Sequence, residues 1–308
     1  MRLFLSPLLL AVATTLALAA DNEVLPDIEN GAQAVSLFGK PLHSPEPEAG
    51  TLARLAEAED AYRDAPGDAD SIIWYGRRTA YTGDYRQAIR IFSEGIVKHP
   101  RDARMYRHRG HRYISIREFD RAIADLEHAA QLIEGTENRI EPDGLPNALN
   151  IPVSTLHGNI WYHLGLAYYL KHDWKNALRA YDTAYNLGGN DDNRVSTTHW
   201  RYMILRRMGI DGDEASAILE PITADMRVIE NQSYHRLCLF YKGELSIDAI
   251  TGDVTGTAGG SAVAYGIANW HWYEGEEARA VELMQSLVDG DGWDAFGAIA
   301  AEADLASM

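Results

Sequence analysis

Residues 72–100 read IIWYGRRTAYTGDYRQAIRIFSEGIVKHP, and residues 106–134 read YRHRGHRYISIREFDRAIADLEHAAQLIE. The two stretches match at an interval of 34 residues, and three pairs of positions carry the match: Gly76 and Gly110, Tyr85 and Phe119, and Ala88 and Ala122. Apolar residues recur at helical spacing on both sides of a short polar turn in each stretch. The pattern therefore predicts two copies of one unit, a pair of helices joined by a turn.

The sizes of its residues explain how such a unit packs. Small residues allow two helices to cross closely, and large ones fill the space between neighbouring pairs. One pair alone cannot bury its apolar face, so several pairs must stack.

Units of this length and pattern resemble the tetratricopeptide repeat (TPR) family. The first clear unit matches it at Ile72, Gly76, Tyr85, Ala88, Phe92, Gly95 and Pro100. The second matches at Tyr106, Gly110, Tyr113, Phe119, Ala122, Leu126 and Ala129, with Glu134 in place of the closing proline. The third matches at Trp161, Gly165, Tyr168, Trp174, Ala177, Tyr181 and Ala184. The resemblance implies an all-α fold, a superhelix (solenoid) of antiparallel helix pairs.

An insertion interrupts the array after the second unit. Gly110 and Gly165 lie 55 residues apart, about 21 more than one period, and the extra residues fall at 135–157. This segment contains Pro142, Gly144 and Pro146, and Pro and Gly at this density exclude a regular helix. Insertions in repeat arrays often lie on the binding face.

The remainder of the chain divides by composition. We predict a signal peptide at 1–20, a linker at 21–48, N-terminal TPR units at 49–134, the insertion at 135–157, C-terminal TPR and TPR-like units at 158–290, and a tail at 291–308. The linker is rich in proline, so we expect it to be mobile or loosely docked. The Gly- and Ala-rich tail is expected to fray.

The N-terminus predicts export. Arg2 precedes an apolar stretch, and small residues end it before Asp21, which is typical of a signal peptide of the bacterial type. A retained membrane anchor is the alternative, although Pro7 and two threonines interrupt the apolar run. We expect a periplasmic or secreted protein, with no membrane span after cleavage. Lys and Arg number 28 against 45 Asp and Glu, a net charge of -17, which argues against binding to nucleic acid.

The resemblance also implies which residues face the groove of the superhelix, because the first helix of each TPR pair lines it. These positions are Asp70, Ile73, Arg77, Tyr81, Arg104, Arg107, His111, Asn159, Tyr162, Leu166 and Tyr169. From them we select as candidate partner-binding residues Arg77, Tyr81, Arg104, Arg107, His111, Tyr162 and Tyr169. The Lys and Asn residues with which some TPR proteins clamp a C-terminal carboxylate are not reproduced.

A basic cluster opens the second unit: Arg104, Arg107, His108, Arg109, His111 and Arg112. Arginine forks bind carboxylates and phosphates, so the cluster indicates a groove for an anionic segment. The alternative is that these arginines pair with Asp and Glu of neighbouring helices, as most exposed charges do.

No residue pattern indicates catalysis. His108 and His111 are spaced for a shared metal, but no third ligand follows, so neither a metal nor another cofactor is expected. We therefore predict a scaffold that binds a protein or a peptide, including one with an anionic segment. The main alternative is an enzyme or accessory subunit with a pocket between the insertion and the array, containing His108, His111 and His163. A structural spacer is a third option.

Overall fold

The computed structural model describes residues 25–28, 31–251 and 258–308, so the predicted signal peptide lies outside the described residues. The helices are α1 (Ala49–Asp64), α2 (Ala69–Tyr81), α3 (Tyr85–Lys98), α4 (Ala103–Ser115), α5 (Phe119–Leu132), α6 (Leu156–Leu170), α7 (Trp174–Leu187), α8 (Asp191–Arg207), α9 (Gly212–Ser216), η2 (Ala217–Leu219, 3-10), α10 (Gln232–Tyr241), α11 (Ile247–Thr251), α12 (Ala258–Tyr273), α13 (Glu277–Val288) and α14 (Phe296–Ser307). Two short strands, β1 (Ala34–Val35) and β2 (Pro41–Leu42), form an antiparallel hairpin.

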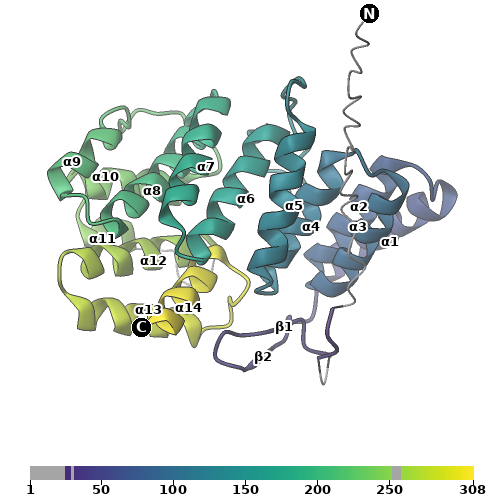
Figure 1. The fold of residues 1–308 in the computed structure, drawn as a ribbon, viewed down its shortest axis with the longest axis horizontal. Coiled ribbons are helices and arrows are strands. Elements are labelled where there is room, and N and C mark those ends of the chain that lie inside the picture. Colours follow the sequence, from purple (N-terminus) through teal and green to yellow (C-terminus); the bar gives the residue numbers. More distant parts are fainter. Residues whose placement is uncertain (1–24, 29–30, 252–257) are drawn as a thin grey trace, which may run out of the picture.

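The three clear units are the stacked helix pairs α2–α3, α4–α5 and α6–α7 (Figure 1). In each pair the predicted glycine lies where the two helices cross. An added Cβ would lie 2.5 Å from Phe92 at Gly76, 2.8 Å from Leu126 at Gly110, and 2.7 Å from Tyr181 at Gly165. Only glycine allows this approach, and the predicted superhelix of antiparallel helix pairs is confirmed.

The turn inside each unit has one residue in the left-handed conformation. These residues are Gly83 (φ 83°), Arg117 (φ 68°) and His172 (φ 56°). The first two are 34 residues apart and all three occupy the same place in their units. Glycine adopts this conformation freely, whereas Arg117 and His172 adopt it at a cost.

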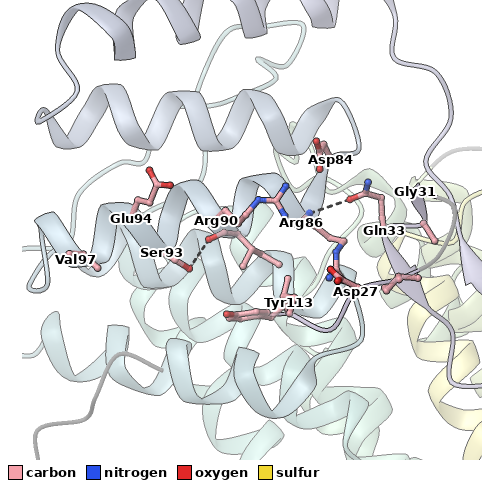
Figure 2. A pocket seen from close by; sticks show the side chains of 14 residues that line it. Asp27, Gly31, Gln33, Asp84, Arg86, Arg90, Ser93, Glu94, Val97 and Tyr113 are labelled. Carbon is pink, nitrogen blue, oxygen red and sulfur yellow. Dashed lines mark hydrogen bonds between the residues drawn. The ribbon is translucent and has the colours of Figure 1, made fainter. Parts of the chain in front are cut away.

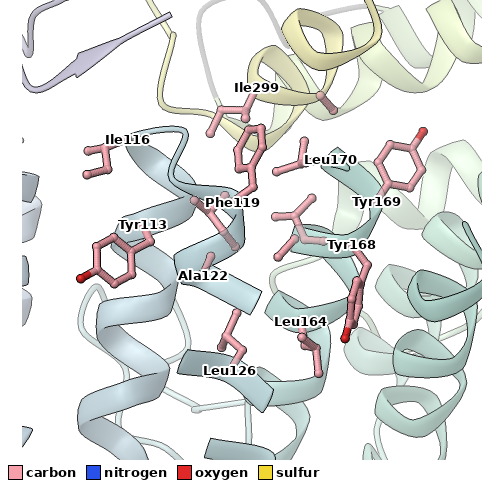
Figure 3. Close-up of a cluster of buried hydrophobic side chains, with 14 of the residues drawn as sticks. Tyr113, Ile116, Phe119, Ala122, Leu126, Leu164, Tyr168, Tyr169, Leu170 and Ile299 are labelled. Carbon is pink, nitrogen blue, oxygen red and sulfur yellow. The ribbon is translucent and has the colours of Figure 1, made fainter. Parts of the chain in front are cut away.

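The C-terminal half departs from regular pairs and curls back. The helix that would pair with α8 is reduced to the short α9 and η2, and the pair α10–α11 is also short. As a result α12 packs against α8, and α14 packs against α6 (Figure 1). Figure 3 shows the consequence in the core, where Ile299 of α14 lies over Phe119 and Leu170.

The segment at 21–48 is docked where it is described, contrary to the expectation of a loose linker. Ser44 Oγ donates to the carbonyl oxygen of Gly83 (2.8 Å), and Leu37 N donates to Glu302 Oε1 (2.5 Å). Ala34 in the hairpin is buried. Proline density indicated that this segment is not helical, but it carried no information about these contacts.

The tail at 291–308 does not fray, so the expectation drawn from its Gly- and Ala-rich composition is wrong. It forms α14, with Glu302 and Asp304 both buried. Glu302 pairs with Arg117 (2.6 Å) and Asp304 with His172 (3.0 Å). The terminal helix therefore binds the strained turns of the second and third units. None of the helices in the described ranges has the length and apolar character needed to traverse a bilayer.

Candidate functional site

The inner surface of the array is formed by the first helices of the three units. We define the inner groove as Arg77, Arg78 and Tyr81 of α2, Arg107 of α4 and Asn159 of α6. A side chain caps the beginning of each helix by accepting a backbone N–H, and the caps are Asp68, Asp102 and Thr155. Capping fixes where each helix begins, and so which residues face inward.

The insertion lies across the inner groove, held by its main chain. Arg77 Nη2 donates to the carbonyl oxygen of Pro142 (2.9 Å), and Arg78 Nη1 donates to that of Gly144 (2.6 Å). Tyr81 approaches Gly144 so closely that an added Cβ would lie 1.8 Å from Tyr81 Oη. A side chain at position 144 would collide with the Tyr81 ring where it now lies, so either the ring or the segment would have to move.

A buried carboxylate anchors the same segment. Glu141 Oε2 accepts a hydrogen bond from Asn159 Nδ2 (2.6 Å) and lies 3.2 Å from Arg107 Nη2. Glu141 Oε1 lies 3.1 Å from His108 Nε2. Burial alone would raise the pKa of Glu141, but Arg107 and His108 hold it well below its usual value. The insertion therefore presents a charged carboxylate to the groove at all ordinary pH values.

His108 is neutral in this arrangement. Burial, with the positive charge of Arg107 beside it, lowers the pKa of His108 to about 3. Arg107 Nη1 donates to His108 Nδ1 (2.7 Å), so the imidazole proton is on Nε2 and faces Glu141.

Two further arginines of the basic cluster are paired with acids, as the alternative expected, whereas Arg112 lies over the ring of Tyr85. Arg104 binds Asp70 (2.5 Å) and Asp102 (2.6 Å) at a half-exposed position. Arg109 makes two hydrogen bonds of 2.7 Å with the buried Asp125. Arg107 is the residue of the cluster that forms an ion pair with the insertion.

Two other candidate residues lie deeper along the same inner surface. The His111 ring lies 4.2 Å from that of His163 and 5.3 Å from Phe296 of α14. Burial, together with nearby arginines, lowers the pKa of His111 well below its usual value. Tyr162 accepts a hydrogen bond from Trp200 Nε1 (2.8 Å) and lines a cavity beside the insertion.

Tyr169, which we selected as a groove-facing candidate, is buried and does not face an open groove. Its side chain is 1% exposed, and its ring packs edge-on against Trp174 and Trp200. Its hydroxyl lies 2.7 Å from that of Tyr265. The repeat pattern placed Tyr169 on the inner face, but α12 and α14 cover that face in this half of the molecule.

The cavity beside the insertion has a volume of about 250 Å³. Its walls come from residues 153–155, α6, α8, the beginning of α10, and Phe296. Of the three histidines that we considered for an enzyme pocket, only His163 lines it, and burial lowers the pKa of His163 to about 3. Within the described ranges no group of three or more His, Cys, Asp and Glu side chains is arranged to hold a metal ion.

A larger cavity lies away from these residues. It has a volume of about 640 Å³ and is bounded by α3, by Tyr113 and by residues from 25–28 and 31–33 (Figure 2). Arg86 and Gln33 meet across it through a hydrogen bond of 3.2 Å (Figure 2). It contains none of the inner-groove residues.

Sequence reasoning missed two residues of the site. Arg78 is adjacent to the predicted Arg77, and helical geometry had assigned only one of the two to the groove. Gly144 was recognised as a helix breaker in the insertion, but not as a contact. An Asp-Gly pair between two prolines indicates a tight turn, without saying what the turn touches.

No family model matches the chain. Among solved structures, it resembles YrrB, described as a TPR protein with an unusual peptide-binding site (18% identity, TM-score 0.41), covering 80% of this chain and 97% of that one. It also resembles a tetratricopeptide repeat protein from Parabacteroides merdae (14% identity, TM-score 0.47), covering 82% of this chain and 92% of that one. These are distant similarities in helix arrangement, and the fold assignment rests on the repeated helix pairs of the chain itself.

Proposed function

We propose that this chain is a helical-repeat scaffold that binds a protein or peptide partner along its inner groove. The supporting observation is that the groove holds an extended polypeptide segment, its own residues 141–144, through Arg77, Arg78 and Arg107. Contacts to backbone carbonyls suit any sequence, whereas the contact of Arg107 with a carboxylate selects an acidic residue. The partner that fits best is therefore an extended segment with acidic side chains.

Binding rather than catalysis is proposed because no reactive pair lines the adjoining cavity. His163 Nδ1 is 2.6 Å from the carbonyl oxygen of Asn159, and no hydrogen bond joins His163 to a serine or cysteine of the described residues. A histidine that activates a side-chain nucleophile lies within hydrogen-bond reach of it.

A displayed library of random 12-residue peptides, panned against the immobilised full chain, tests the proposal. We expect the retained peptides to be enriched in Asp and Glu, and Arg78→Ala to reduce their retention. The matched control is Arg63→Ala, an exposed arginine of α1 outside the groove. Retained peptides without acidic enrichment, or equal retention by Arg78→Ala and the control, would contradict it.

We propose further that the chain is exported, on the strength of residues 1–20 alone. Expression of the full chain in a bacterium should yield a periplasmic or secreted protein whose N-terminal sequence begins near Asp21. A cytoplasmic product that retains Met1–Ala20 would contradict export.

A further inference from the structure

The insertion leaves some buried hydrogen-bond donors of the inner groove without a partner. Arg77 and Arg107 are each more than nine-tenths buried, and the Nε atom of each is buried without a hydrogen-bond partner. An arginine side chain forms its strongest contact when Nε and one Nη bind both oxygens of one carboxylate. Arg77 instead binds a single carbonyl, and Arg107 meets Glu141 through Nη2. Both arginines therefore have an Nε donor that the insertion leaves unused. The insertion's own Asp143 interacts electrostatically with Arg77, but its buried Oδ2 makes no hydrogen bond.

The insertion also contributes little apolar burial. Four of its large apolar side chains face solvent, with exposed fractions of 57% for Ile140, 61% for Leu145, 62% for Leu149 and 48% for Ile151, whereas Val153 is buried. Burial of apolar surface is the main stabilising contribution of most segments, and this one buries polar atoms instead. One isolated β-bridge, between Ile140 and Thr155, is its only strand pairing in the described residues. A segment held in this way is easily replaced by another chain that makes the same polar contacts.

We propose that residues 140–145 occupy the inner groove in place of a partner, and that the partner is an extended segment with two carboxylates, one for Arg107 and one for Arg77. This inference rests on the proposed function and specifies its ligand. One partner carboxylate takes the place of Glu141 and makes the bidentate contact with Arg107. The second replaces the carbonyl of Pro142 at Arg77. The partner thus gains contacts that the insertion lacks, which is the free-energy difference that displaces the insertion.

The test measures binding of a free peptide to a chain whose own insertion has been released. Gly144→Val releases it, because a side chain at position 144 collides with the Tyr81 ring where it now lies, while every groove residue stays intact. Leu149→Ala is the matched control, in the same insertion but with its side chain in solvent. The probe is a fluorescein-labelled synthetic peptide of residues 138–148. A second probe carries Glu in place of Pro142, and a third carries Gln in place of Glu141.

By fluorescence anisotropy, we expect Gly144→Val to bind the first probe at least roughly tenfold more tightly than the wild-type chain or Leu149→Ala. The second probe should bind more tightly than the first, and the third roughly tenfold or more weakly, because one charge-assisted contact is gained or lost. Equal affinity for wild type and Gly144→Val would overturn the displacement. Equal affinity of the three probes would overturn the two-carboxylate partner.

A second variant that releases the insertion keeps the test valid if Gly144→Val does not fold. Glu141→Gln weakens the anchor without a steric change, and it should bind the second probe more tightly than the wild type does. Faster tryptic cleavage after Arg139, together with a single cooperative thermal unfolding transition, verifies release in a folded protein for either variant. A released, folded variant that binds none of the probes overturns the inference. The proposed function fails separately, if the peptide library yields no acidic enrichment, or if Arg78→Ala retains peptides as well as Arg63→Ala does.

Discussion

At the scale of single residues, the strained turns show how a local cost is offset by a distant contact. Arg117 occupies the position that glycine occupies in the first unit, at a cost of about 1 kcal/mol. Its guanidinium pairs with the buried Glu302 and donates to the carbonyl oxygen of Trp293 (2.8 Å). Removing one member of a buried ion pair costs about 3–5 kcal/mol, so the contact outweighs the strain.

Arg117→Gly should therefore destabilise the protein by about 2–4 kcal/mol, even though it relieves the backbone. The matched control is His172→Gly at the equivalent turn, where Asp304 keeps Tyr265 (2.8 Å) and Arg207 as partners. The free energy of unfolding of the control should lie within about 1 kcal/mol of the wild-type value, because relief of backbone strain offsets one lost hydrogen bond. Urea denaturation measures both, and the reverse order of the two variants would contradict this explanation.

At the scale of elements, the helix crossings were the most predictable feature of the chain. The 34-residue interval identified Gly76 and Gly110 because close packing within a helix pair depends on residues that are near in sequence. The same reasoning found Gly165 after the insertion. It did not find the place of the insertion itself, because contacts such as that of Arg77 with Pro142 join residues 65 apart and leave no periodic trace.

Gly165→Ala tests the crossing directly. Alanine favours the helix by up to about 1 kcal/mol over glycine. At this site its Cβ meets the fully buried ring of Tyr181 at 2.7 Å, and overpacking costs about 1–3 kcal/mol. With the full propensity gain subtracted, we expect a net loss of up to about 2 kcal/mol in the free energy of unfolding, measured by urea denaturation. Gly50→Ala, which enters open space in α1, should be neutral or stabilising; a stabilising Gly165→Ala would show that the crossing is not tight.

At the scale of the whole molecule, both terminal segments close the array. The hairpin segment binds the turn of the first unit, and α14 binds those of the second and third. Leu37 N and Glu302 are 265 residues apart, so composition could describe these segments but could not place them. This closure also explains why Tyr169 is buried, while the groove residues of α2 and α4 form a polar inner surface.

Truncation after Gly290 should consequently destabilise the protein, rather than remove a mobile tail. It would expose the apolar surface around Ile299 and leave Arg117 unpaired. We expect the thermal midpoint to fall by at least about 5 °C and a hydrophobic dye to bind. An unchanged midpoint would restore the original expectation of a fraying tail.

Buried neutral histidines should make the whole fold sensitive to acid. Burial is the main cause that lowers the pKa of His108, His163 and His199 to about 3, and that of His111 well below its usual value. The unfolded chain binds these protons near pH 6.5 and the folded chain does not, so stability is complete above pH 6.5 and is lost as pH falls toward 3. Each histidine contributes a slope of up to about 1.4 kcal/mol per pH unit.

Urea denaturation between pH 7.5 and 4.5 checks this dependence. His199→Gln should lower the slope of the unfolding free energy against pH by the contribution of about one proton. The reason is that the pKa shift of His199 comes from burial alone. A free energy of unfolding that does not change over this range would show that the histidines are already protonated in the folded protein.

The central claim, that the insertion holds the place of a partner, is tested most directly by amide hydrogen exchange of residues 139–147 in the wild-type chain. The Glu141 amide donates to the carbonyl oxygen of Ser154 (2.9 Å), so its exchange reports whether the segment is seated. Adding the labelled probe with Glu at position 142, at a saturating concentration, should speed exchange in this segment and slow it in α2 and α4. Exchange in the insertion that stays the same or slows while the probe is bound would contradict displacement.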